Sequence, residues 1–215
     1  RLIRGLAEPD IRRENMDMND PAAVGFKDQT IFAQAVWFAA EAHCNALRKG
    51  TDTPYLIHLM ETAVIASGMT SDPVILAAAM LHDSVEDTQA QIEDIERAFG
   101  PEVAKIVAAM TEDKRSHLPR EETWLLRKRE YIDHLRREAG EGAKIVALAD
   151  KLSNIRAIAA DCRKIGEEVW LRFNQKDKAM HEWYYRSALD ALREFREQDA
   201  WKELSSLIDT VFGHA

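Results

Sequence analysis

The sequence contains few residues that make turns and few that make covalent cross-links. Only nine glycines and six prolines occur among its 215 residues, well below the roughly 12 % of average usage. So few turn residues favour long helices and argue against a sandwich or barrel of many short strands. The two cysteines, Cys44 and Cys162, are too few for a disulfide framework or a thiolate zinc site.

Positive charge and long hydrophobic runs are also scarce. Lysine and arginine together number 29 against 37 acidic residues, which gives a formal net charge of −8 at pH 7. Binding to a nucleic-acid backbone requires a surplus of cations, so we expect no nucleic-acid partner. No apolar run reaches the roughly 18 residues that span a bilayer, and the charged first residues contain no apolar stretch of signal-peptide length. We therefore expect a cytoplasmic protein without a membrane partner.

The hydrophobic pattern predicts an all-α protein. Apolar residues make up 46 % of the chain, enough for a sizeable core, and they recur at helical spacing, as at Ile31, Ala35 and Phe38. No strand or repeat is evident, so we expect one all-α bundle of about ten helices over residues 26–215, after an arm at 1–25. The helices are expected at 28–48, 57–68, 73–87, 91–99, 101–111, 123–139, 143–164, 166–174, 177–196 and 200–212, with a polar loop at 112–122.

The segment LHDSVEDT, residues 81–88, is the most informative about function. On a helix, His82 and Glu86 lie one turn apart, as do Asp83 and Asp87, so that all four side chains share one side. An apolar run leads directly into them, and three acids beside an imidazole are costly to bury unless a cation compensates their charge. The simpler alternative is an exposed acidic helix end.

Two residues elsewhere in the chain fit the same site. His58 lies at the start of the second expected helix, a position where an isolated histidine is more often structural than a ligand. Asp150 interrupts the apolar stretch IVALAD, and Asn154 follows it by one helical turn, which places both on the same face. These residues become candidates because the acidic segment already predicts a cation.

Three motifs resemble those of the HD-domain phosphohydrolases. The likeness is to the alarmone hydrolases, which are related to the hydrolase half of the bifunctional (p)ppGpp synthetase/hydrolases. The motifs are RKGTDTPYLIH at 48–58, LHDSVEDT at 81–88 and ALADKLSNIR at 147–156. Weaker matches are TEDK at 111–114, W-x-x-R-K-x-x-Y-I at 124–132 and WYYR at 183–186. Three motifs in this order, within a match over about residues 28–160, are far more specific than an HD doublet alone.

The resemblance implies an HD-type alarmone hydrolase domain that removes the 3′-pyrophosphate of guanosine tetra- or pentaphosphate. The metal, usually manganese in this group, would be held by His58, His82, Asp83 and Asp150. The attacking water and the protons would be handled by Glu86 and Asp87. The nucleotide would be bound by Arg48, Lys49, Lys114, Arg127, Lys128, Lys151, Asn154 and Arg156. Two imidazoles and two carboxylates suit a six-coordinate first-row cation better than a closed tetrahedral zinc site.

The chain departs from the family pattern at Ser153 and Ala157, where the bifunctional enzymes carry His and Thr. That Thr lies beside the base, so Ala157 removes an expected base contact. Two alternatives use the same site: hydrolysis of another nucleotide, such as NADPH or ppApp, and an inactive nucleotide-binding sensor module. All four ligands and both acids are present, which favours an enzyme. The expected partner is a small nucleotide, and the late aromatics are candidates for the core or for a homodimer contact: Trp183, Tyr184, Tyr185 and Trp201.

Overall fold

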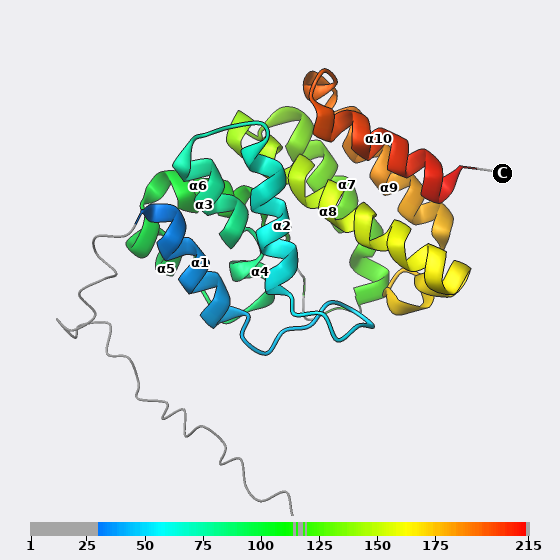
Figure 1. The fold of residues 1–215 in the computed structure, drawn as a ribbon, viewed down its shortest axis with the longest axis horizontal. Helices are drawn as coiled ribbons and strands as arrows, with labels where there is room; N and C mark the ends of the chain where they lie inside the picture. Colours follow the sequence, from blue (N-terminus) through cyan, green and yellow to red (C-terminus); the bar gives the residue numbers. More distant parts are fainter. Residues whose placement is uncertain (1–29, 114, 116–117, 119, 214–215) are drawn as a thin grey trace, which may run out of the picture.

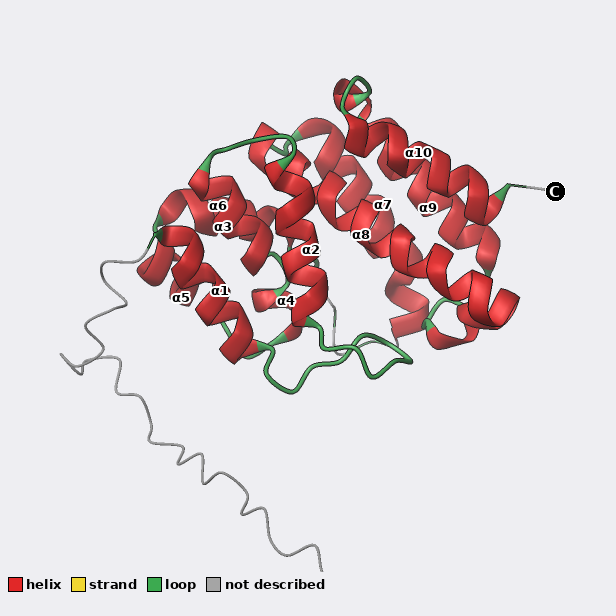
Figure 2. Cartoon of the chain, in the orientation of Figure 1, coloured by secondary structure: helices red, strands yellow, loops and turns green. Residues whose placement is uncertain are grey.

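The computed structural model describes residues 30–113, 115, 118 and 120–213, and in this part of the chain the protein is all-α (Figures 1 and 2). The only β pairing among these residues is an isolated bridge between Leu47 and Pro54, so the predicted fold class is confirmed. None of the described helices is both long enough and apolar enough to cross a membrane. The arm expected at 1–25 and the candidate Lys114 lie outside the described residues.

Ten α-helices and two short 3-10 helices occur in the described residues. Their bounds are α1 Ile31–Ala42, α2 Leu56–Ser67, α3 Pro73–Leu81, α4 Ser84–Asp87, α5 Ile92–Phe99, α6 Pro101–Met110, α7 Arg120–Arg137, α8 Glu141–Ile165, η1 Gly166–Arg172, α9 Lys178–Ala191, η2 Arg193–Phe195 and α10 Asp199–Phe212. Local signals set several of these ends. At the start of α3, for example, the Asp72 side chain accepts a hydrogen bond from the Val74 N–H at 2.9 Å and Pro73 occupies the first turn.

The central element is α8, which packs against α2, α3, α6 and α10. In Figure 1, α2 and α8 run through the middle, with α1, α5 and α6 on one side and α9 and α10 on the other. Residues 145–153 of α8 are all buried, and so is the second half of α3, residues 77–81. A helix buried around its whole circumference needs an apolar sequence on every face, and the sequence of α8 breaks that rule at Asp150, Lys151 and Ser153. These three buried polar residues lie at the candidate functional site.

The helix predicted over residues 73–87 is in fact two helices. α3 ends at Leu81, and α4 begins at Ser84 after Asp83 adopts φ −99° and ψ 0°. The His82 imidazole bonds to the Ala79 carbonyl, and the Asp83 carboxylate accepts a hydrogen bond from Tyr55 on another element. These side-chain contacts replace the regular helix, so Glu86 and Asp87 reach the site from a separate short helix.

The helix predicted over residues 28–48 also ends early, at Ala42. The chain from 43 to 55 forms a long loop, green in Figure 2, which is closed by hydrogen bonds from Arg48 N to Thr53 O and from Tyr55 N to Ala46 O. Arg48 and Lys49 therefore lie in the loop between α1 and the start of α2. At the other end of the chain, Tyr184 and Tyr185 are buried and belong to the core.

Candidate functional site

Two buried histidines from different helices face each other next to two aspartates. His58 is in the first turn of α2 and His82 follows α3, with ring centroids 5.3 Å apart. The His58 Nε2 atom is 3.1 Å from Asp150 Oδ1 and 3.7 Å from Asp83 Oδ2. The His82 Nε2 atom is 3.0 Å from Asp83 Oδ2 and 3.6 Å from Asp150 Oδ1. Residues distant in sequence thus bring four donor groups to one point.

Hydrogen bonds at the far side of each ring fix where the histidine protons lie. His82 Nδ1 is 2.9 Å from the Ala79 carbonyl oxygen, which only accepts, so Nδ1 carries a proton. His58 Nδ1 is 2.8 Å from the Ser153 hydroxyl oxygen. Both Nε2 atoms are buried and lie 3.0–3.7 Å from the two carboxylates, but among the described residues neither makes a hydrogen bond of good geometry. A buried nitrogen without a well-formed hydrogen bond is costly, so the space between the rings and the carboxylates suits a bound cation.

A divalent cation fits this arrangement. Ligand atoms of His58, His82 and Asp150 lie within 4.8 Å of one another, and Asp83 Oδ2 lies 3.7 and 3.0 Å from the Nε2 atoms of His58 and His82. Imidazole nitrogen with carboxylate oxygen is a donor set that first-row divalent metals accept. The aspartates are also prepared to be anionic: burial raises the pKa of Asp150, but Lys151 and the two imidazoles outweigh it and hold that pKa well below its usual range.

The residues around the aspartates hold their charges in place. Burial, followed by the nearby Asp83 carboxylate, raises the pKa of Tyr55, so its hydroxyl keeps its proton and donates to Asp83 Oδ2 at 2.6 Å. Lys151 Nζ is 2.5 Å from Asp150 Oδ2 and lies over the rings of Tyr131 and Tyr184. Burial lowers the pKa of Lys151, but Asp150 raises it more, so the ammonium stays charged.

The cluster opens into a cavity of about 800 Å³, within the range of roughly 300–1,000 Å³ that small-molecule sites occupy. The walls come from the 43–55 loop, α2, α4, α7, α8, η1 and α9, so segments across most of the chain contribute. Glu86 and Asp87 border the same cavity. Burial, followed by the Asp83 and Glu112 carboxylates, raises the pKa of Glu86 to about 7. A carboxyl with that pKa can exchange a proton near neutral pH.

The expected nucleotide-binding residues divide into two groups. Those that border the cavity are Arg48, Lys49, Arg127, Lys128, Lys151 and Asn154. Arg156 does not border it, because its guanidinium forks onto Glu203 of α10 at 2.7 and 2.6 Å and also pairs with Glu61 at 3.1 Å. The sequence motif placed Arg156 next to the site, but which helix its side chain would meet depended on the packing of α10.

The cationic side chains of the cavity wall differ in whether a carboxylate within the protein already pairs with them. Arg127 and Lys128 both bind Glu112, at 2.9 and 2.6 Å, which offsets part of their charge. Arg48 donates to the neutral amide oxygen of Asn154 at 3.0 Å, and its guanidinium lies 5.9 Å from the Tyr55 ring centroid. Arg48 therefore brings a charge into the cavity that these two contacts do not neutralise.

Several residues that shape the site were not singled out from the sequence. Tyr55 and Ser153 lie inside recognised motifs, and a buried hydroxyl beside a metal-binding residue was a signal available there. Glu61 lies outside the quoted motifs, and Glu112 lies in the weaker TEDK match at 111–114. Glu112 donates its backbone N–H to Glu86 at 3.3 Å and receives Arg127 and Lys128, so it links the proton-handling acid to the cationic wall. Only the fold reveals that role.

The sequence matches the family described as "HD domain" over residues 35–174. The chain belongs to the HD-domain family. All four candidate ligands of this HD-domain chain lie inside the matched segment, and the HD doublet itself is His82-Asp83. An HD hydrolase domain together with a buried His, His and Asp cluster indicates a divalent metal. Helices α9 and α10 lie entirely beyond the matched residues.

Relatives of this HD-domain chain carry a specific enzymatic name. "Guanosine-3′,5′-bis(diphosphate) 3′-pyrophosphohydrolase MESH1" of Xenopus tropicalis is 40 % identical over 146 residues, which are 66 % of this chain and 75 % of that protein. The protein of the same name from Homo sapiens is 39 % identical over 141 residues, 64 % of this chain and 72 % of that one. A "GTP pyrophosphokinase rsh" of Brucella suis is 31 % identical over 150 residues, 66 % of this chain but 19 % of that protein.

Solved structures agree with the sequence relatives. The structure described as "A metazoan ortholog of SpoT hydrolyzes ppGpp and plays a role in starvation responses" aligns with a TM-score of 0.70 and 30 % identity. The alignment covers 86 % of this chain and 98 % of that one. The crystal structure of lmo0812 from Listeria monocytogenes EGD-e aligns with a TM-score of 0.64 and 27 % identity, over 73 % of this chain and 99 % of that one. The HD-domain chain is thus similar to these proteins in fold and in sequence.

Proposed function

We propose that this protein is a metal-dependent hydrolase that removes the 3′-pyrophosphate from guanosine tetra- or pentaphosphate. The products are pyrophosphate and GDP or GTP. One observation carries the proposal: two imidazole nitrogens and two carboxylates converge at the base of a large cavity with cations in its wall. The relatives named for this activity, at about 40 % identity, support the same substrate.

The metal would be held by His58, His82, Asp83 and Asp150, and we propose Mn²⁺. When bound, the cation lowers the pKa of its water ligand and polarises a phosphate oxygen. Two nitrogen and two oxygen donors leave room for water and substrate in a six-coordinate shell, which suits Mn²⁺ better than a closed tetrahedral zinc site.

Glu86 and Asp87 are the proposed proton-handling pair. Hydrolysis deprotonates the attacking water and returns a proton to the departing 3′ oxygen of the ribose. Glu86, with a pKa near 7, can accept or give that proton close to neutral pH. Its backbone partner Glu112 holds one carboxyl oxygen, Oε2, at 3.3 Å and so orients the acid.

Cations on more than one side of the cavity suit a ligand that carries several phosphates around one ribose. Arg48, beside Asn154, would stack on the base or fork onto a phosphate. Lys49, Lys128 and Lys151 add positive charge to the wall. The wall also contains Ala157, whose methyl group offers no hydrogen bond to a base. Without that contact the pocket selects guanine less strictly, so the second candidate function is hydrolysis of another nucleotide, such as ppApp or NADPH, through the same metal and acids.

The deciding experiment is a panel of ppGpp, pppGpp, ppApp and NADPH with Mn²⁺, in which pyrophosphate and orthophosphate release are measured separately. The proposal predicts pyrophosphate from ppGpp and pppGpp with the highest kcat/KM. Turnover of ppApp comparable to that of ppGpp would show that the pocket, with Ala157 in its wall, does not discriminate between adenine and guanine. A far higher kcat/KM for NADPH, with orthophosphate as product, would overturn the substrate but not the metal site.

A further inference from the structure

The buried hydroxyl of Ser153 connects a proposed metal ligand to a carboxylate on another helix. Its Oγ atom is 2.8 Å from His58 Nδ1 and 2.8 Å from Glu61 Oε2. Ser153 is on α8 and is 1 % exposed, whereas His58 and Glu61 are one turn apart on α2. The hydroxyl therefore has its two partners within reach and little room to find others.

A count of protons determines the direction of both hydrogen bonds. A carboxylate only accepts, and a hydroxyl has one proton, so Ser153 must donate to Glu61. The same hydroxyl can then only accept from His58, which requires the imidazole proton to be on Nδ1. With its proton there, the neutral ring presents the Nε2 lone pair to the metal site.

We propose that Ser153 and Glu61 are positioning residues that select the metal-binding tautomer of His58. The inference rests on the proposed function only in taking His58 as a metal ligand. His82 needs no such device, because a backbone carbonyl already accepts its Nδ1 proton.

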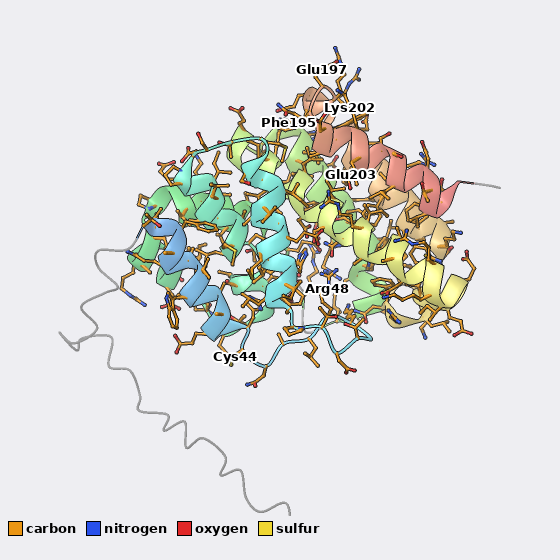
Figure 3. The ribbon with its side chains drawn as sticks, in the orientation of Figure 1. Cys44, Arg48, Phe195, Glu197, Lys202 and Glu203 are labelled. Carbon is orange, nitrogen blue, oxygen red and sulfur yellow. The ribbon has the colours of Figure 1, made fainter. Side chains whose placement is uncertain are left out.

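Arg156, itself paired with a second carboxylate, keeps Glu61 in place. The side chain of Glu61 is 35 % exposed and would be free to turn toward solvent on its own. Its Oε1 atom accepts from Arg156 at 3.1 Å, and Arg156 is in turn forked onto Glu203. Figure 3 shows Glu203 on α10, along the side of that helix that packs on α8. The last helix, which lies beyond the matched HD segment, thereby helps to hold the histidine.

The test is the affinity for Mn²⁺, measured without nucleotide by competition with a chromogenic chelator. S153A removes the acceptor of the His58 proton. E61A lets the Ser153 hydroxyl donate to His58 and so favours the wrong tautomer. Each change should weaken Mn²⁺ binding about 10- to 100-fold, the usual effect of losing a group that orients a metal-bound histidine. The double variant should bind no more weakly than S153A, because Glu61 acts only through the hydroxyl.

Two controls separate this role from general damage. T62V removes a different buried hydroxyl, on α2, which has no hydrogen-bond partner among the described residues. E194A removes a carboxylate that is paired with Lys144 at 2.7 Å and does not line the cavity. Both should leave Mn²⁺ affinity within about twofold of the parent. Because Glu61 is partly exposed, E61A keeps the test usable even if S153A fails to fold.

A spectroscopic measurement detects the tautomer directly. In protein loaded with diamagnetic Zn²⁺, the His58 Nδ1–H should give a downfield proton resonance that exchanges slowly with water, and this resonance should disappear in S153A. Unchanged Mn²⁺ affinity in E61A, additive losses in the double variant, or persistence of the resonance would each overturn the proposal. None of these measurements uses a substrate, so a wrong nucleotide assignment would leave them unaffected.

Discussion

The surroundings of Glu86 disfavour its ionised form. A substitution that removes the charge should therefore affect stability and catalysis in opposite directions. Burial, then the carboxylates of Asp83 and Glu112, raise its pKa from 4.5 to about 7. In the unfolded chain the group keeps its ordinary pKa. That difference corresponds to about 3 kcal/mol of unfolding free energy, which the folded protein loses when Glu86 ionises.

The sign of the pH dependence follows from proton counting. Between pH 4.5 and 7 the unfolded chain has lost the Glu86 proton and the folded protein still holds it. The unfolded state then binds fewer protons, so stability falls as the pH rises, and the loss is complete above about pH 8. In E86Q the side chain is neutral at every pH and keeps its shape. The metal-free variant should therefore match the parent near pH 4.5 and exceed it by up to about 3 kcal/mol at pH 8.

The measurement is urea unfolding of metal-free E86Q and parent protein from pH 4.5 to 8.5. E102Q is the matched control, because Glu102 is an exposed carboxylate in the first turn of α6. Its substitution should change stability by less than about 1 kcal/mol, the usual value of a charge at a helix terminus. If the unfolding free energies of E86Q and the parent depend on pH in the same way, the pKa of Glu86 is not raised and its charge is not destabilising.

Activity should move in the opposite direction. With Mn²⁺ and ppGpp, E86Q should lose about 10²- to 10⁴-fold in kcat, the usual contribution of a positioned acid or base, while Mn²⁺ affinity stays unchanged. A variant that is more stable and far less active is expected where an acid is kept in a costly environment for function. Loss of Mn²⁺ binding in E86Q would instead make Glu86 a ligand, and full activity would remove it from the reaction.

Three further outcomes are expected. R48A should weaken nucleotide binding about thirtyfold, the equivalent of about 2 kcal/mol for a stacked, partly desolvated guanidinium, with Mn²⁺ affinity unchanged. The control is R97A, which removes an exposed arginine of α5. Loss of Mn²⁺ binding in R48A would contradict the reasoning. Chelation should abolish hydrolysis, and Mn²⁺ at a hundred times its Kd should restore it and stabilise the fold by about 2.7 kcal/mol; activity that survives chelation would refute the metal assignment. Burial lowers the pKa of His181, so the unfolded state binds a proton that the folded state does not, and the contribution of His181 to stability should be lost as the pH drops below about 6.5. H181Q, compared with the parent by urea unfolding, should lack this part of the pH dependence; the same profile in both proteins would exclude His181 as its source.

The architecture and the chemistry-bearing residues could be predicted from local sequence. Helical spacing, scarce turn residues and the Asp72-Pro73 start signal depend on neighbours within a few positions, and so they are readable without a structure. The same holds for the informative motifs, because an apolar run that ends in acids and an imidazole requires compensation wherever it folds. The all-α bundle and the candidate ligands therefore followed from composition, periodicity and resemblance.

The break between α3 and α4 and the fate of each cation depended on tertiary structure. Local pattern favoured one helix through His82 and Asp83, but Tyr55, 28 residues away, donates a hydrogen bond to Asp83 at the break between α3 and α4. Arg156, expected at the nucleotide, does not border the cavity and binds Glu203, 47 residues later. Side-chain hydrogen bonds and ion pairs act over about 3 Å, and only packing brings such distant residues that close. The sequence therefore determined which groups were available, and the packing of α2, α8 and α10 decided which of them met.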